Sequence, residues 1–284
     1  MNEIFNIGNV FQTNETILEF ICKALIEIAE NYYDTVGFYL DKIAGFTIFL
    51  IDSNIERLKI LGFEFWCRLG TEEADRVKHK SINKGHPKYY IQPYFEKLKN
   101  IIEKNILPKS TDDLEDDWNS SKASCFILSK IVQVIDNTNF ENICLQIREL
   151  FKNKLDQNQK YKALMMLTCA FESIHKSLAF QLALQFLFKL LNILETEDPY
   201  SRLLASKALV KLTKLSAKFL EPNNLNRIIP VLQEMIYTDN RIGLNICLCL
   251  NNMVTVLGDQ GTNKSTSKSL LLNLIHFRSI FSLF

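Results

Sequence analysis

Hydrophobic and polar residues follow one another along this chain with the spacing of amphipathic helices. Residues 15–33 show the pattern well, because apolar side chains recur every three or four positions and charged side chains lie opposite them. The apolar stripe consists of Ile17, Phe20, Ile21, Ala24, Leu25 and Ile28. No segment sustains the two-residue alternation that is typical of a strand. The pattern therefore predicts an all-α fold.

Similar stripes predict further helices along nearly the whole chain. They cover roughly 38–51, 55–69, 89–107, 120–135, 140–155, 160–174, 178–194, 200–219, 225–237 and 242–257. The helix over 55–69 is expected to continue past Leu69 and to end before a loop around Ser81–Pro87. The low content of turn residues, with Gly 9 and Pro 6 in 284 residues, agrees with helices joined by short connections.

Turn and capping signals recur at a nearly constant interval. They fall near Asn14, Asn54, Asp117, Asn158, Asp198 and Asp239. Asp198-Pro199 gives the mechanism, since the aspartate can cap a helix start and proline fits the first helical position. Most steps are about 40 residues, the period of HEAT or armadillo helix pairs. We therefore expect a HEAT-repeat α-solenoid, in which antiparallel helix pairs stack into one continuous core.

The predicted organisation has three parts. Residues 1–257 form the solenoid of about six helix pairs, the first of them incomplete. Residues 258–268 are a polar loop or linker, and residues 269–284 are an apolar tail that fits one helix of an incomplete repeat. We expect no signal peptide, and no apolar stretch reaches the roughly 20 residues that a membrane span needs.

Composition and motifs argue against catalysis. The seven cysteines form no CxxC pair and lie mostly in apolar runs, which favours buried thiols in a reduced compartment. The four histidines lack metal-ligand spacing, and nucleotide-binding and hydrolase motifs are absent. The carboxylate clusters Glu72-Glu73 and Asp112–Asp117 do not lie in the apolar surroundings that acid–base chemistry uses. We expect no enzyme activity, no cofactor and no metal.

The net charge of +1 also gives no reason to expect binding to nucleic acid or to a membrane. One basic cluster is the exception, and a solvated basic face is the simpler interpretation of it than a nucleic-acid site. It comprises Arg76, Lys78, Lys80, Lys84, Lys88, Lys97 and Lys99.

The most distinctive segment is acidic. Five of the six residues 112–117 are Asp or Glu, and Trp118 follows at a predicted helix start. One interpretation is a solvated helix cap, because carboxylates stabilise a helix N-terminus. The other is a docking site for a basic partner, in which the acids attract it and the indole ring stacks on a Lys or Arg side chain.

This segment resembles the acidic loop of the importin-β nuclear transport receptors, a run of Asp followed by Trp-Asn-x-x-Lys-Ala. Several other stretches are similar to the family in the same order, over roughly residues 4–257. They are Tyr32-Tyr33, Gly62 with Phe63-Glu64-Phe65-Trp66 and Glu72-Glu73, Lys160-Tyr161-Lys162, Asp198-Pro199 and Asn245-Ile246-Cys247.

The resemblance implies protein recognition in nucleocytoplasmic transport, in the cytoplasm, the nucleus and the nuclear pore. Implied partners are an importin-α-type adaptor or basic cargo, the GTPase Ran, and Phe-Gly nucleoporins. The implied partner-binding residues are Asp112, Asp113, Glu115, Asp116, Asp117, Trp118 and Asn119. An outer-helix nucleoporin groove is implied at Ile43, Phe46, Thr47 and Leu50, with ordinary core packing as the alternative.

The chain departs from the family where later inner helices carry Trp and Arg-Asp positions. Leu209 and Leu248 occupy the matching Trp positions, and a leucine supplies no ring face for a basic side chain. The acidic loop favours the transport interpretation over its alternative, a generic HEAT scaffold or regulatory subunit.

Overall fold

The computed structural model describes residues 14–79, 85–106, 118–152, 156–172, 176–215 and 222–259. Within these ranges the chain consists of helices and their connections, and it contains no strand. The chain forms two compact units, residues 1–146 with 172–174 and residues 147–171 with 175–284. The prediction of an all-α solenoid is confirmed.

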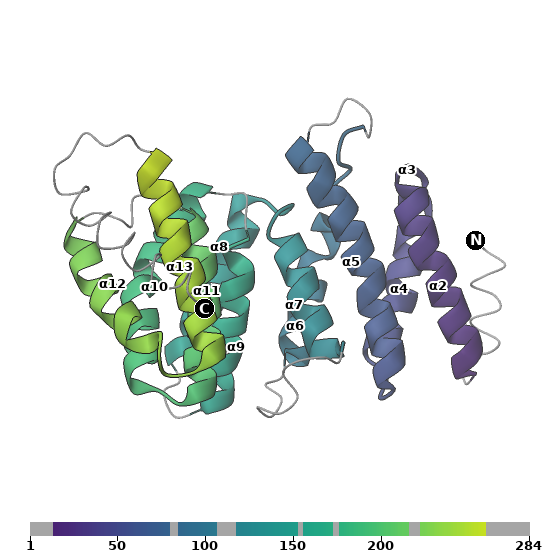
Figure 1. Ribbon diagram of the computed structural model, residues 1–284. Helices are drawn as coiled ribbons and strands as arrows, with labels where there is room; N and C mark the ends of the chain where they lie inside the picture. The colour runs from purple at the N-terminus through teal and green to yellow at the C-terminus, as the bar shows by residue number, and fades with distance from the viewer. Residues whose placement is uncertain are drawn as a thin grey trace. The chain divides into compact units, whose positions relative to one another are not determined.

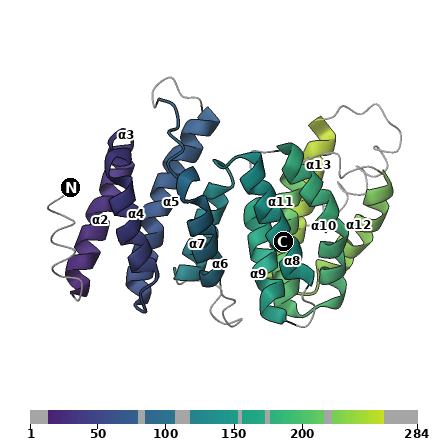
Figure 2. The same cartoon turned by 180° about the vertical axis from the view of Figure 1, so that it is seen from behind.

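The first unit is built around one long helix (Figures 1 and 2). Its helices are α2 (Glu15–Asn31), α3 (Tyr33–Val36), α4 (Leu40–Ile51), α5 (Glu56–His79), α6 (Phe95–Asn105) and α7 (Ser120–Ile131), with 3₁₀ turns at Gly37–Tyr39 and Gln92–Tyr94. Helix α5 packs against α2 on one side, α7 on the other, and α4 behind. Helices α2, α5 and α7 therefore form one layer, and α4 and α6 lie against it.

The second unit repeats the same arrangement. Its helices are α9 (Gln157–Ala170), α10 (Lys176–Thr196), α11 (Pro199–Leu215), α12 (Pro222–Met235) and α13 (Asn240–Asp259), and α8 (Asn137–Lys152) enters the unit at residue 147. Helix α11 packs against α9, α10 and α13, while α12 packs against α10 and α13. Helices α9, α11 and α13 thus form one layer in this unit.

Helix starts follow the predicted caps closely. Asn14 accepts a hydrogen bond from the Ile17 N–H at 3.2 Å, and Asp239 accepts from the N–H groups of Arg241 and Ile242 at 2.9 and 3.2 Å. The cap of α9 is Asp156 rather than Asn158, because its carboxylate accepts from two amides of the first turn. Asp117 lies outside the described residues, and the side chain that caps α7 is Asn119.

The core of the first unit is aromatic. Phe63, Phe65 and Trp66 on α5 are fully buried, and the Trp66 indole N–H donates to Thr47 Oγ1 at 3.0 Å. Gly62 lets α5 approach α4, since a Cβ there would lie 2.7 Å from the Thr47 carbonyl oxygen. The Thr47 hydroxyl thus satisfies the polar atom of the buried Trp66 ring.

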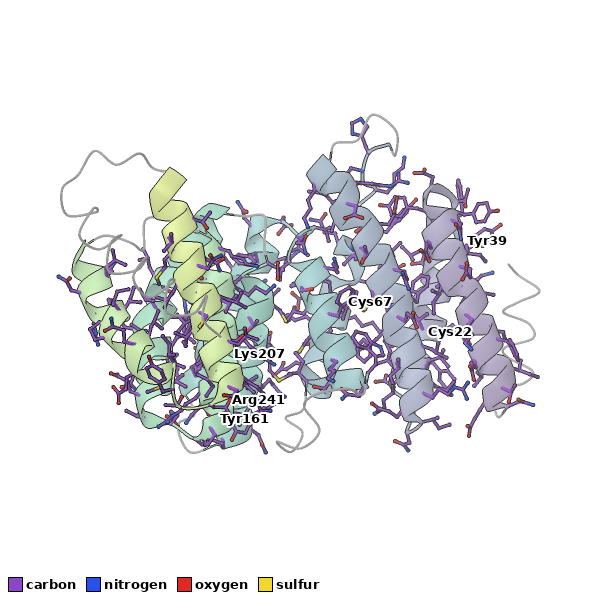
Figure 3. The ribbon with its side chains drawn as sticks, viewed as in Figure 1. Cys22, Tyr39, Cys67, Tyr161, Lys207 and Arg241 are labelled. Carbon is purple, nitrogen blue, oxygen red and sulfur yellow. The ribbon has the colours of Figure 1, made fainter. Side chains whose placement is uncertain are left out.

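The apolar stripe of α2 differs from the predicted one. The buried apolar residues are Leu18, Ile21, Cys22, Leu25, Ile26 and Ala29. Phe20 is 67% exposed, so it does not belong to the core. The helix is apolar around much of its circumference, and packing against α5 selects the Leu18 side. Figure 3 shows Cys22 and Cys67 among the helices of this unit, and both thiols are buried.

The predicted ends of the chain are not described. Residues 1–13 and 260–284 lie outside the described residues, and with them nearly all of the predicted linker and the whole apolar tail. Helix α13 continues to Asp259, two residues past the predicted end of the solenoid.

Candidate functional site

The predicted partner-binding segment is described only at its end, where it enters α7. The residues Asp112, Asp113, Glu115, Asp116 and Asp117 lie outside the described residues, and Trp118 and Asn119 are described. Asn119 is buried, and its Oδ1 accepts the Lys122 N–H at 3.0 Å. Its side chain therefore caps the helix, which gives it a structural role at this site.

The start of α7 is also held by the first turn of α5. The Ser120 N–H donates to Glu56 Oε1 at 2.8 Å, and the Ser120 hydroxyl donates to Glu56 Oε2 at 3.2 Å. A carboxylate is well placed at this end because the first amides of a helix lack partners within it. The capping pair and Glu56 thus fix the position from which Trp118 projects.

Trp118 is accessible, as predicted from its place before a helix. It is 51% exposed, and its ring meets Phe126 edge-on with 6.2 Å between the centroids. Phe126 is 40% exposed, and Lys130 Nζ lies 5.1 Å from its centroid. The two rings form an exposed aromatic corner on α7, where a cationic side chain could pack on a ring face.

The four residues of the implied nucleoporin groove do not form a groove surface. Ile43, Thr47 and Leu50 are fully buried, and Thr47 Oγ1 accepts the hydrogen bond from the Trp66 indole N–H. Only Phe46 is half-buried, and its neighbour Phe49 is 48% exposed. Core packing, the alternative left open by the sequence, describes the burial of Ile43, Thr47 and Leu50.

A buried polar cluster in the first unit was missed by the sequence analysis. Glu73 on α5 accepts a hydrogen bond from the Tyr33 hydroxyl at 2.9 Å, from the Tyr90 N–H, and from the Ile91 N–H at 3.4 Å. The Tyr33 hydroxyl accepts in turn from the Lys88 N–H at 2.8 Å. The carboxylate therefore ties residues 88–91 to α3 and α5.

The cluster corrects the expectation that Glu73 does not lie in the apolar surroundings that acid–base chemistry uses. Its side chain is fully buried, and this burial raises its pKa, although the hydrogen bonds from Tyr33, Tyr90 and Ile91 act in the opposite direction. Glu73 is thus the kind of carboxylate that acid–base sites use. Its hydrogen-bond donors, the Tyr33 hydroxyl and the backbone N–H groups of Tyr90 and Ile91, hold the chain together around it.

Arg76 belongs to the same cluster rather than to a solvated basic face. Its guanidinium pairs with Asp34 at 3.2 Å and with Glu72 at 3.0 Å, and it lies 4.1 Å from the centre of the Tyr33 ring. The side chain is 7% exposed. Nearby, Tyr89 has a φ of 57°, which costs about 1–2 kcal/mol for a residue with a Cβ. The hydrogen bonds of residues 88 and 90 hold it in that conformation.

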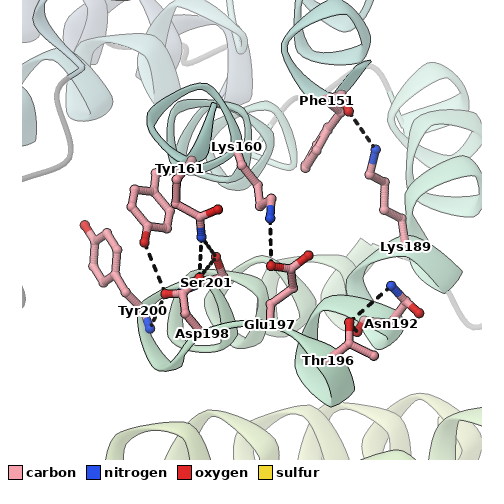
Figure 4. A network of polar contacts seen from close by, with 11 residues as sticks. Phe151, Lys160, Tyr161, Lys189, Asn192, Thr196, Glu197, Asp198, Tyr200 and Ser201 are labelled. Atoms are coloured by element: carbon pink, nitrogen blue, oxygen red, sulfur yellow. Dashed lines mark hydrogen bonds and ion pairs between the residues drawn. The ribbon is translucent and has the colours of Figure 1, made fainter. Parts of the chain in front are cut away.

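In the second unit, two motifs that are far apart in the sequence meet at one turn (Figure 4). Asp198 accepts from the N–H groups of Tyr200 and Ser201 at 3.0 Å each and from the Tyr161 hydroxyl at 3.1 Å. Lys160 pairs with Glu197 at 2.7 Å. Burial of Asp198 acts to raise its pKa, but the hydrogen bonds, led by those from Ser201, lower it. This polar network joins α9 to the start of α11.

The two leucines that replace the family's inner Trp residues differ in exposure. Leu209 is buried, so this position of α11 contributes to the core and not to a surface. Leu248 on α13 is 43% exposed. Neither leucine offers a ring face for a basic side chain.

Other kinds of site find no support in the described part of the chain. The structure there brings together no group of three His, Cys, Asp or Glu side chains suited to a metal ion. Within the same ranges, no helix has the length and hydropathy of a bilayer span. Burial raises the pKa of the Cys22 and Cys249 thiols to about 12, so these thiols are protonated near neutral pH.

Comparison with known proteins identifies the fold. No family model matches the sequence. Importin subunit beta-1 of Schizosaccharomyces pombe is 22% identical over 276 residues, which cover 88% of this chain and 31% of that protein. The solved structure of yeast importin-beta (Kap95p) matches with a TM-score of 0.79 and 15% identity, over 92% of this chain and 31% of that one. The chain is importin-β-like.

Further solved structures match this importin-β-like chain. A crystal structure of importin beta matches with a TM-score of 0.77 and 18% identity, over 86% of this chain and 29% of that one. Kap95p structures with RanGDP and with Nup1 match with TM-scores of 0.75 and 0.76, at 16% identity each. They cover 85% and 91% of this chain, and 29% and 31% of theirs. The chain thus spans about a third of the length of the proteins it matches.

Proposed function

We propose that this importin-β-like chain recognises other proteins in nucleocytoplasmic transport, and that the acidic segment with Trp118 binds a basic partner. The observation that carries the proposal is the exposed ring of Trp118, fixed directly after Asp112–Asp117 by the Asn119 cap and Glu56. A ring that only filled the core would be buried, as Trp66 is.

Two partner classes fit this corner. One is a Lys- or Arg-rich segment of cargo or of an importin-α-type adaptor, and the other is a basic surface of Ran. The carboxylates would speed encounter with either partner, while stacking on Trp118 would contribute about 0.5–2 kcal/mol that salt screens less. The Kap95p complex with RanGDP supports this class of partner by analogy of fold.

Nucleoporin binding is a second part of the proposal. The Kap95p complex with Nup1 supports it, again by analogy of fold. On α4, Phe46 and Phe49 are the aromatic side chains that reach the surface, so a Phe-Gly segment would contact these two residues rather than the buried Ile43, Thr47 and Leu50. The proposal gives the chain a binding role in the cytoplasm, nucleus and nuclear pore, and no catalytic one.

The test is a titration of a labelled Lys/Arg-rich peptide against the full chain at low and physiological salt. Trp118→Ala should weaken binding at both salt concentrations, because it removes a stacking surface. Changing Asp116 and Asp117 to Asn should weaken binding mainly at low salt, because exposed charges are screened over about 8 Å at 0.15 M.

Two matched variants serve as controls. Tyr237→Ala removes an aromatic ring that is 78% exposed in the second unit, and Asp52→Asn with Glu149→Gln removes two exposed acids elsewhere. Both should bind the peptide like the wild type. If the Trp118 variant matches these controls, the segment is a solvated cap and the generic-scaffold interpretation gains.

A further inference from the structure

The layer that α9, α11 and α13 form in the second unit is rich in basic residues. Helix α9 contains two Lys or Arg residues, α11 contains four and α13 contains one. The three helices together contain a single acid, Asp259, at the last position of α13. In the first unit, by contrast, α2 alone contains Glu15, Glu19, Glu27 and Glu30 against one lysine. Asp156, Asp198 and Asp239 lie before the starts of these three helices and cap them.

Three lysines of α11 reach the surface as a strip on one side of the helix. This helix packs against α9, α10 and α13, and most of its residues are buried. Lys207, Lys211 and Lys214 follow one another at intervals of four and three residues, so they share one helical face. Lys207 and Lys214 are exposed, and Lys211 is half-buried.

Two leucines on α13 adjoin this strip. Asn245 Nδ2 donates to Ser206 Oγ at 2.9 Å, and Asn252 Nδ2 donates to Thr213 Oγ1 at 3.1 Å, which defines the side of α13 that faces α11. Leu244 and Leu248 lie about a quarter turn from that side.

Buried Ile246 and Leu250 lie on the opposite flank of α13, toward the core. On α11, which runs parallel to α13, the lysines are rotated from the Ser206–Thr213 line in the opposite sense, and this places them on the same side of the layer as the two leucines. Figure 3 labels Lys207 and Arg241, one on each of these neighbouring helices.

Packing among the described residues of the unit leaves two leucines of α13 exposed. Leu244 is 64% exposed and Leu248 is 43% exposed, while their neighbours Ile246 and Cys249 are fully buried. A strip of lysines beside a pair of exposed leucines has the polarity that complements an amphipathic helix with acids on one flank and apolar side chains on the other.

We propose that this face, defined by Lys207, Lys211, Lys214, Leu244 and Leu248, binds an acidic amphipathic segment of a partner protein. Charge complementarity indicates a negatively charged partner, since a basic segment would be repelled by the lysines of this face. The leucines select a protein over a nucleic acid, because a phosphate backbone would leave them in water. This inference concerns the second unit and does not rest on the Trp118 site.

The test measures binding of a labelled peptide of about 16 residues, with leucines at helical i, i+3 and i+4 spacing and Glu or Asp elsewhere. The full chain should bind it, and a scrambled peptide of the same composition should bind more weakly. Lys207→Glu with Lys214→Glu should weaken binding about tenfold or more, or about 1.4 kcal/mol. Leu244→Ala with Leu248→Ala should weaken it at both low and physiological salt.

The matched control, Lys104→Glu with Lys152→Glu, reverses the charge of two exposed lysines on α6 and α8. It should bind the peptide within about twofold of the wild type. Circular dichroism checks that each variant folds. The proposal is overturned if this control weakens binding as much as Lys207→Glu with Lys214→Glu does. It is also overturned if scrambling the peptide, or the two leucine substitutions, leaves the affinity unchanged. Single-stranded RNA that binds more tightly than the peptide, with an affinity that Leu244→Ala and Leu248→Ala do not change, would also overturn it.

Discussion

The buried carboxylate of Glu73 gives the sharpest test of how the first unit is held together. Replacing it with glutamine keeps the shape but changes the hydrogen bonding. The Tyr33 hydroxyl and the Tyr90 N–H both donate to Oε1, which a glutamine carbonyl oxygen can replace. The Ile91 N–H donates to Oε2, where the amide would place a second donor.

The size of the effect follows from these contacts. One buried N–H left without an acceptor costs about 1–3 kcal/mol, and two bonds to a charged acceptor become weaker bonds to a neutral one. Loss of a desolvated charge offsets part of this. We expect Glu73→Gln to lower the free energy of unfolding by about 1–3 kcal/mol, and Glu73→Ala, which removes all three acceptors, by about 3–5 kcal/mol.

The pH dependence has a definite sign. Because the folded-state pKa of Glu73 is raised above its unfolded value, the folded state binds the proton more tightly. The stabilisation from that proton is complete below the unfolded pKa and is lost as the pH rises through the folded pKa. The deficit of Glu73→Gln relative to the wild type should therefore be largest in acid and should shrink toward neutral pH.

Urea unfolding followed by circular dichroism, at a series of pH values, measures these quantities. Glu64→Gln on the same helix is the matched control, since Glu64 is 37% exposed and its nearest charged partner, Arg68, lies 3.7 Å away. It should change stability by less than about 0.5 kcal/mol. A Glu73→Gln deficit that grows from acid to neutral pH would refute the reasoning, because the carboxylate would then be held by its donors more strongly than it is penalised by burial.

Three further predictions concern single positions. Trp66→Ala should lower the free energy of unfolding by about 3–5 kcal/mol and Trp118→Ala by less than about 0.5 kcal/mol, so equal losses in chemical denaturation would contradict the buried and exposed assignments. Gly45→Ala should stabilise α4 by about 0.5–1 kcal/mol, because a Cβ there meets nothing within 4 Å. Gly62→Ala should destabilise the protein by about 1–3 kcal/mol, because a Cβ there meets the Thr47 carbonyl oxygen of α4. Melting temperatures of the two variants that shift in the same direction would show the α4–α5 contact to be wrong. Asp198→Ala should cost about 1–2 kcal/mol above the unfolded pKa of aspartate and less as the pH falls through its lowered folded pKa, and a cost that does not change with pH would exclude a charged cap.

The local features of this protein could be predicted from the sequence alone. Helix positions follow from apolar spacing, and the caps at Asn14, Asp198 and Asp239 follow from residues within one turn of each helix start. Burial of Trp66 and exposure of Trp118 were predicted in the same way, from the apolar or acidic residues beside each ring. These features depend on contacts three or four residues apart, which a sequence pattern records directly.

Other features were decided only by tertiary packing. The role of Glu73 depends on Tyr33, which lies 40 residues earlier, and the charged residues beside Glu73 in the sequence give no sign of burial. The predicted stripe of α2 included Phe20, yet packing against α5 leaves that ring in solvent. The shared side of Lys207 and Leu244 likewise follows from how α11 and α13 pack. A helical pattern gives the relative angle of residues within one helix, but only the neighbouring helices determine which of those angles points into the core and which faces a partner.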